Sequence, residues 1–103
     1  MSYKLRFTQK FKQEFINEYL ELERKFEQLE KETPEFPKGK RYLPYIGREG
    51  SNTLIWECDF PTLHEAQHAL ALMLADNRHE ELFAQQARYI LGTHTEIFKP
   101  YDS

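Results

Sequence analysis

The chain has 103 residues, the size of one domain, and its 14 lysines and arginines against 17 aspartates and glutamates give a formal net charge of −3. The basic residues are dispersed among acidic ones, which argues against nucleic-acid binding. An aromatic fraction of 15% supplies the apolar surface of a core and argues against disorder. We therefore expect a single domain over residues 1–103.

The sequence also favours a cytoplasmic protein. It contains no apolar run of membrane-spanning length, and Met1 to Lys10 has no hydrophobic signal core. Cys58 is the only cysteine, so neither an internal disulfide nor a cysteine metal cluster is expected. We expect Cys58 to be a small apolar residue buried on a strand.

The first elements are a short strand and a long helix. The strand is predicted from alternation over Tyr3 to Phe7, and Thr8 is a suitable N-cap for the helix. Apolar residues three or four positions apart predict the helix, and Pro34 and Pro37 end it. These residues are Phe11, Phe15, Tyr19, Leu22, Phe26 and Leu29. The stripe is shorter than three heptads, which favours packing on a sheet over a coiled-coil seam. The Glu/Lys-rich face from Glu18 to Lys31 is predicted to be solvated.

Two strands, Arg41 to Arg48 and Thr53 to Phe60, are expected to form a hairpin around Glu49–Asn52. We expect Arg48 to face Thr53, a register that also pairs Tyr45 with Trp56. One face then carries Leu43, Tyr45, Leu54, Trp56, Cys58 and Phe60, and the other carries Tyr42, Pro44, Ile46, Arg48, Ile55, Glu57 and Asp59. Pro44 indicates an edge strand or a bulge.

A second helix is expected to open at Pro61–Thr62 and to fray at Asp76–Asn77. A short helical segment follows, in which His79 is expected to be a solvated surface residue. Gly92 is expected to break this segment, and Thr93 to Lys99 is the last predicted strand. The element order predicts an α+β protein with a ferredoxin-like β-α-β-β-α-β arrangement, in which an antiparallel sheet carries helices on one face. The other face must meet solvent, a ligand or a second subunit.

Three segments together resemble the NIPSNAP-like branch of the dimeric α+β barrel superfamily: Ser51 to Thr62, Asp76 to Phe83, and the closing strand Thr95 to Phe98. The resemblance implies a homodimer whose two sheets face each other around a cavity. Relatives in the superfamily include cofactor-independent monooxygenases, and many NIPSNAP-like members have no assigned activity. The resemblance carries over no catalytic residue, because fold alone does not imply function.

His64-Glu65-Ala66-Gln67-His68 matches the H-E-x-x-H pattern of zinc peptidases, in which two histidines four apart on a helix share one metal ion. Thr62 and Glu65, however, also form a capping-box pattern, which explains the glutamate without catalysis. Ala71 and Leu74 stand where the extended metal-binding pattern needs Gly and His. We treat His64 and His68 as remote metal candidates and expect no metal or other cofactor.

The charged sheet face is the second candidate site. Tyr42, Arg48, Glu57 and Asp59 are expected to face the cavity of a dimer, with His94 or Glu96 from the last strand. These groups can bind a polar small molecule, act as general acid and base, or simply pair with one another or across the dimer. The sequence therefore favours a dimeric ligand-binding or structural module. A cofactor-independent monooxygenase is the alternative, a zinc peptidase the remote one, and whether the protein is an enzyme stays open.

Overall fold

Four strands and three α-helices follow one another in the predicted order in a computed structural model that describes residues 2–102. They are β1 (Tyr3–Phe11), α1 (Ile16–Glu32), β2 (Lys40–Tyr42), β3 (Thr53–Phe60), α2 (Leu63–Ala75), α3 (Asn77–Gln86) and β4 (Ile90–Phe98), with short 3₁₀ turns at Gln13–Phe15 and Ala87–Tyr89. The sheet order is β2-β3-β1-β4, and every neighbouring pair is antiparallel. This arrangement is the predicted ferredoxin-like α+β fold.

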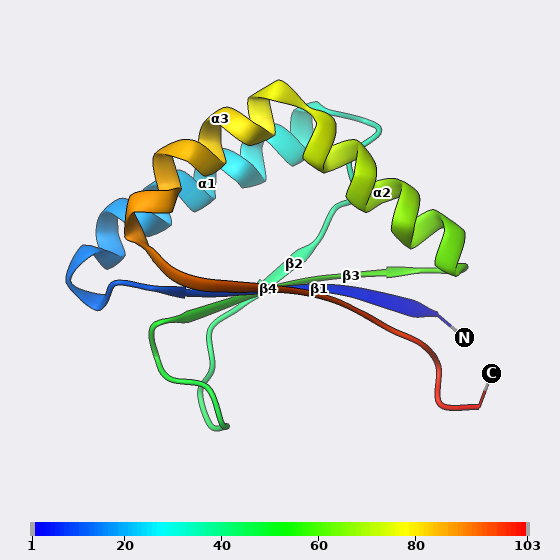
Figure 1. Ribbon diagram of the computed structural model, residues 1–103, viewed down its shortest axis with the longest axis horizontal. Coiled ribbons are helices and arrows are strands. Elements are labelled where there is room, and N and C mark those ends of the chain that lie inside the picture. The colour runs from blue at the N-terminus through cyan, green and yellow to red at the C-terminus, as the bar shows by residue number, and fades with distance from the viewer. Residues whose placement is uncertain (1, 103) are drawn as a thin grey trace.

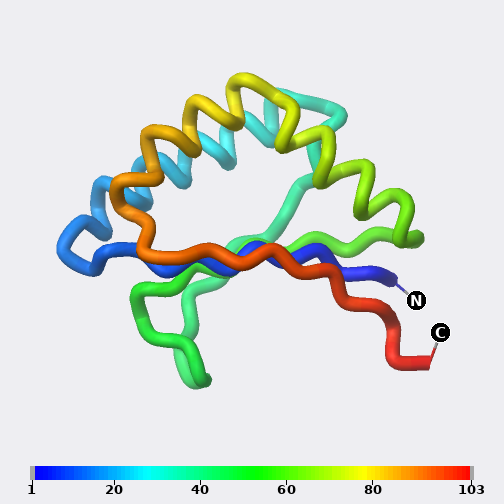
Figure 2. Tube along the Cα trace, viewed as in Figure 1, coloured from blue at the N-terminus to red at the C-terminus, as the bar shows by residue number. Residues whose placement is uncertain are grey.

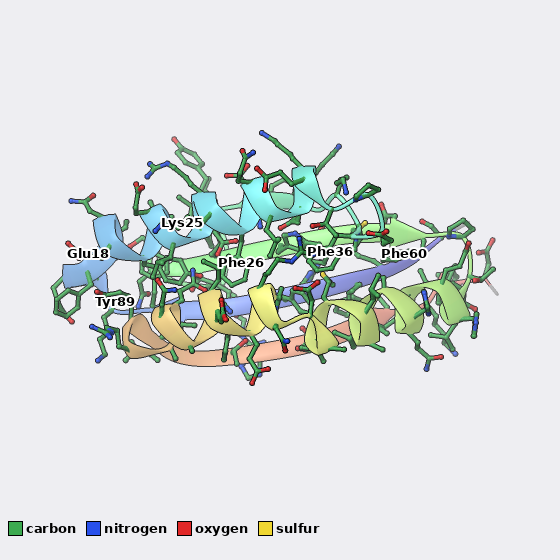
Figure 3. All side chains as sticks on the ribbon, turned by 90° about the horizontal axis from the view of Figure 1, so that it is seen from above. Glu18, Lys25, Phe26, Phe36, Phe60 and Tyr89 are labelled. Atoms are coloured by element: carbon green, nitrogen blue, oxygen red, sulfur yellow. The ribbon has the colours of Figure 1, made fainter. Side chains whose placement is uncertain are left out.

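All three α-helices cover one face of the sheet (Figure 1). Seen from the helix side, α1 lies along one half of the sheet, and α2 and α3 follow each other along the other half (Figure 3). Within residues 2–102, the opposite face of the sheet carries no helix, and we call it the open face. Among the described residues, no helix is both long and apolar enough to cross a membrane.

The core forms where alternate residues of the strands meet the helices. Leu5 and Phe11 of β1 are fully buried, and Phe7 stacks on Trp56 of β3 with ring centroids 4.9 Å apart. From α1, Tyr19 lies over Phe11 at a centroid distance of 4.4 Å. Alternation in the strands and three-to-four spacing in the helix are the two periods that place these residues on one side.

β1 is longer than predicted, and Thr8 lies inside it rather than at a helix N-cap. The strand continues because its end finds partners on both sides. The Phe11 amide donates to the carbonyl of Asn52 at 2.9 Å, and the Lys12 amide donates to that of Tyr89 at 2.8 Å. Backbone groups paired with neighbouring strands are not available for a helix, so α1 begins only at Ile16.

The hairpin register was predicted wrongly. Only Lys40–Tyr42 is a strand, and Arg41 rather than Tyr45 lies opposite Trp56. Pro44 has no amide hydrogen for the sheet, and residues 43–52 form a long connection that leaves the sheet on the open-face side (Figure 1). Leu43 and Tyr45 therefore do not join the Trp56 face. The observed register differs from the predicted one by an even number of residues. Because side chains alternate between the two faces of a strand, Tyr42 still lies on the predicted face.

Two helix starts show side-chain caps. The Thr62 hydroxyl accepts from the Glu65 amide at 3.1 Å, which confirms the predicted capping interaction. Asp76 caps α3 and accepts from the Arg78 amide at 2.8 Å. Gly92 lies within β4 instead of ending a helix, because the short turn Ala87–Tyr89 has already brought the chain back to the sheet.

Candidate functional site

The predicted cavity residues do not form one cluster. Tyr42, Glu57, Asp59 and His94 lie on the open face, whereas Arg48 is exposed in the connection between β2 and β3. Tyr42 and His94 lie in one row across the sheet, which runs Tyr42, Ile55, Thr8, His94. They occupy opposite edges, roughly 14 Å apart at the usual strand spacing. These two side chains therefore cannot share one small ligand within a single copy.

Basic side chains of β1 already pair with the two acidic candidates. Glu57 Oε2 accepts from Arg6 Nε at 2.7 Å, and its Oε1 lies 3.3 Å from Lys4 Nζ. Lys4 Nζ also lies 3.4 Å from Asp59 Oδ1. The pKa of Lys4 is raised, because the hydrogen bond and charges of Glu57 and Asp59 outweigh the lowering effect of burial. This pairing favours a structural role over acid–base chemistry.

The histidines of the H-E-x-x-H string are both exposed on α2, and Glu65 is engaged at the helix start. Over residues 2–102, no group of three or more His, Cys, Asp or Glu side chains is arranged to hold a metal ion. Two histidines without a third protein ligand are a poor match for zinc.

A buried charged cluster lies between α1 and the sheet, on the side that carries the helices. Arg41 of β2 pairs there with Glu23 and Glu30 of α1, with Nε 2.6 Å from Glu23 Oε2 and Nη2 bonded to Glu30 Oε2. The Trp56 indole nitrogen donates to Glu30 Oε1 at 3.2 Å. The prediction that the charged residues from Glu18 to Lys31 are solvated was therefore wrong for Glu23 and Glu30.

Arg41 neutralises only one of these two carboxylates. Burial by itself lowers the pKa of Arg41, but the hydrogen bond that Arg41 donates to Glu30 and the charges of Glu23 and Glu30 outweigh it and raise that pKa above its ordinary value. Arg41 is therefore permanently charged. With both carboxylates ionised, the cluster carries an excess of one negative charge on the inner side of the sheet.

Gln86 closes the cluster from α3 and is fully buried. Its Nε2 donates to Glu23 Oε1 at 2.9 Å and to the Tyr19 carbonyl at 3.5 Å. Both partners are acceptors, so the amide nitrogen must face them and the oxygen must point away. No hydrogen-bond partner reaches Gln86 Oε1 within the described chain. A buried acceptor without a partner is costly and marks a place where a donor is missing.

His79 of α3 is half-buried rather than solvated, which corrects the prediction made for it. Its ring lies 5.0 Å from the Phe26 ring and 6.5 Å from the Phe36 ring, between centroids. Figure 3 shows Phe26 and Phe36 in the space between α1 and the α2–α3 side. Burial lowers the pKa of His79 below its ordinary value, and the nearby carboxylates of Asp76 and Glu30 only partly oppose this.

We expect acidification to destabilise the protein through His79. The unfolded chain binds a proton near the ordinary pKa of 6.5, whereas the folded chain resists it. Stability is therefore full above that value and falls as the pH drops through it toward the lowered folded pKa. Thermal unfolding between about pH 7.5 and about pH 5 should show a steeper loss for the wild type than for His79→Gln, and equal slopes would contradict this assignment.

Two adjoining hollows open beside the cluster. The inner cavity measures about 50 Å³, and Glu23, Glu30, Arg41, Trp56 and Gln86 contribute to its wall. The helix-side cleft measures about 390 Å³ and lies between α2–α3 and strands β1 and β4. Its lining residues are Phe7, Gln9, Leu74, His79, Glu80, Phe83, Thr93 and Thr95. The two hollows share Phe7, Gln9, His79 and Phe83, so they adjoin.

The cluster left one signal in the sequence. Glu23 and Glu30 lie seven residues apart, and Glu23 is four after Tyr19 while Glu30 is four after Phe26. Both carboxylates thus belong to the apolar stripe itself rather than to the opposite face. No such signal existed for Arg41 or Gln86, because only the folded chain brings β2 and α3 to α1.

Comparison with known proteins shows similarity in fold. Neither a protein-family model nor a curated protein matches the chain. A NIPSNAP family protein from Agrobacterium tumefaciens matches with a TM-score of 0.77 and 16% identity, covering 99% of this chain and 95% of that one. A second NIPSNAP family protein from the same organism, described as of unknown function, gives 0.74 and 20%, with 96% and 87% covered. An antibiotic biosynthesis monooxygenase gives 0.74 and 13%, with 95% and 97% covered. The fold implied by the NIPSNAP resemblance is confirmed.

Proposed function

We propose that two copies of this chain pair through their open faces and act as a homodimeric small-molecule-binding module. The main observation in favour of this pairing is the open face. The three α-helices cover the other face of the sheet, and no helix among residues 2–102 covers this one (Figure 1). A chain of this size gains much from covering a second sheet face, since a small domain buries a limited share of its surface alone. The named neighbours share only the fold, so they support no particular reaction.

Charge on the open face suits a partner with the same pattern. One row across the sheet runs Lys40, Glu57, Arg6, Glu96, with alternating sign from strand to strand. A two-fold axis between two such faces can set each basic column against an acidic one, as self-complementary dimers require. In this dimer Tyr42, Glu57, Asp59 and His94 serve as polar contacts of the interface, and a small molecule held between the sheets would meet the same groups.

Exposed apolar side chains at the rim support the same partner. The connection between β2 and β3 descends below the sheet on the open-face side, and so does the end of the chain after β4 (Figure 2). Tyr45 and Ile46 in that connection are 95% and 89% exposed. Tyr101, in the segment after β4, is also fully exposed, and apolar groups exposed at two places beside one face indicate an interaction surface. In the proposed dimer these apolar side chains pack against the partner copy.

A cytoplasmic location fits the chemistry of Cys58. This thiol is unpaired, and burial together with the charges of Asp59 and Glu30 raises its pKa, which keeps it protonated. An unpaired, protonated thiol suits a reducing compartment. We assign the protein there on this ground.

The oligomeric state tests the pairing. Light scattering after size exclusion should give twice the chain mass of 12.4 kDa for the wild type. Ile55→Glu puts a charge at the centre of the open face and should yield a folded monomer, whereas Lys25→Glu on exposed α1 should remain a dimer. A monomeric wild type, or a dimeric Ile55→Glu, would exclude this interface.

A further inference from the structure

We infer that the helix-side cleft is a binding site for a primary amine with a small apolar body, whose ammonium group enters the inner cavity. This site lies on the opposite side of the sheet from the proposed dimer interface. It therefore goes beyond the proposed pairing and can be tested independently of it.

The cleft exists because β4 presents small side chains to α3. Thr93 and Thr95 line its floor beside Phe7 of β1, where larger residues would close it. Above them, Phe83 is 39% exposed and Leu74 is 61% exposed. Phe83 and Leu74 thus expose apolar surface to the cleft above the two threonines. A bound ligand with an apolar body would cover this surface. A hollow of about 390 Å³ with mixed apolar and polar lining is within the usual size of small-molecule sites.

At the inner end, one buried acceptor, Gln86 Oε1, has no hydrogen-bond partner among the described residues. Two donors of the same cavity wall, on Arg41 and Trp56, bond to Glu23 and Glu30 rather than to this oxygen. A ligand group that donates several hydrogen bonds satisfies this oxygen, and an ammonium group carries three donors.

Charge also selects a cation at the inner end. Glu23 and Glu30 face a single guanidinium, and Glu80 adds a third carboxylate at the cleft. His79 stays neutral at physiological pH because burial lowers its pKa. The site therefore attracts an ammonium group and repels a carboxylate, which would have to share low-dielectric space with Glu23 and Glu30.

The body of the ligand meets aromatic surface. Phe7 lines both hollows and stacks on Trp56, and Phe83 lines both hollows as well. The inner cavity of about 50 Å³ holds a group of ammonium size but no ring. The geometry thus fits an amine on a short linker to an aryl or compact alkyl group.

The first experiment titrates 2-phenylethylamine into the wild-type protein, with 2-phenylethanol and 3-phenylpropionate as neutral and anionic counterparts. Trp56 is the only tryptophan, so its fluorescence and its indole NMR signal report on the inner cavity. We expect saturable binding of the amine, binding at least about tenfold weaker for the alcohol, and none for the acid. Absence of saturable amine binding, or equal binding of the acid, would overturn the assignment.

Two variants locate the site. Thr95→Phe fills the cleft floor and should abolish amine binding, and Glu30→Gln should weaken it by about tenfold while leaving the alcohol unchanged. Ile55→Glu should bind the amine as the wild type does, because the open face is not part of the cleft. Unchanged amine binding in both Thr95→Phe and Glu30→Gln would place the amine elsewhere. Loss in Ile55→Glu alone would place it at the sheet interface instead.

Discussion

Arg41→Met should lower the free energy of unfolding by about 3 to 5 kcal/mol, as expected when one partner of a buried ion pair is removed. Arg41 is the cation that pairs with both Glu23 and Glu30, and these carboxylates are buried. Without it, two like charges face each other in a low-dielectric space. Urea denaturation followed by circular dichroism measures the loss, since unfolding of a domain this small is expected to be two-state.

The control removes the charges together. Arg41→Met combined with Glu23→Gln and Glu30→Gln leaves no unpaired charge, so this triple variant should recover most of the stability lost in Arg41→Met. If Arg41→Met costs less than about 1 kcal/mol, the cluster is solvated and its charges are not coupled. A triple variant as unstable as the single one would show that the guanidinium contributes by packing rather than by charge.

Gly39→Ala should destabilise the protein by about 1 to 3 kcal/mol through overpacking. A methyl group at Gly39 would overlap the indole ring of Trp56. Trp56 cannot yield easily, because it is buried, stacks on Phe7 and donates to Glu30. The Gly39 amide also reaches Glu30 Oε1 at 3.4 Å, so a backbone shift would disturb the charged cluster as well.

Gly47→Ala is the matched control, since no atom beyond Gly47 and its two chain neighbours lies within 4 Å of the position that the methyl group would occupy. Its thermal midpoint should stay close to that of the wild type, while that of Gly39→Ala falls and its Trp56 fluorescence changes. Equal midpoints for the two variants would mean that the segment before β2 moves freely away from the indole ring.

Local pattern in the sequence predicted the element order and most of the faces. Alternation in residues 3–7 and 53–60 places Leu5, Phe7 and Trp56 on the helix-covered side, as the structure confirms. The capping pattern at Thr62 and Glu65 was likewise decided within one turn of chain. Side chains alternate between the two faces of a strand and return to the same face of a helix about every 3.6 residues. Both patterns can be read from residues that are close together in the sequence.

Only the tertiary structure decided the length of β2 and which partner the buried carboxylates of α1 bind. Spacing within α1 places Glu23 and Glu30 in the apolar stripe, but only the folded chain brings Arg41 of β2 to them as a partner. His79 is half-buried because α3 packs beside α1, and the cleft is open because β4 places two threonines beneath Phe83. Each depends on contacts between segments far apart in sequence, which local periodicity does not encode.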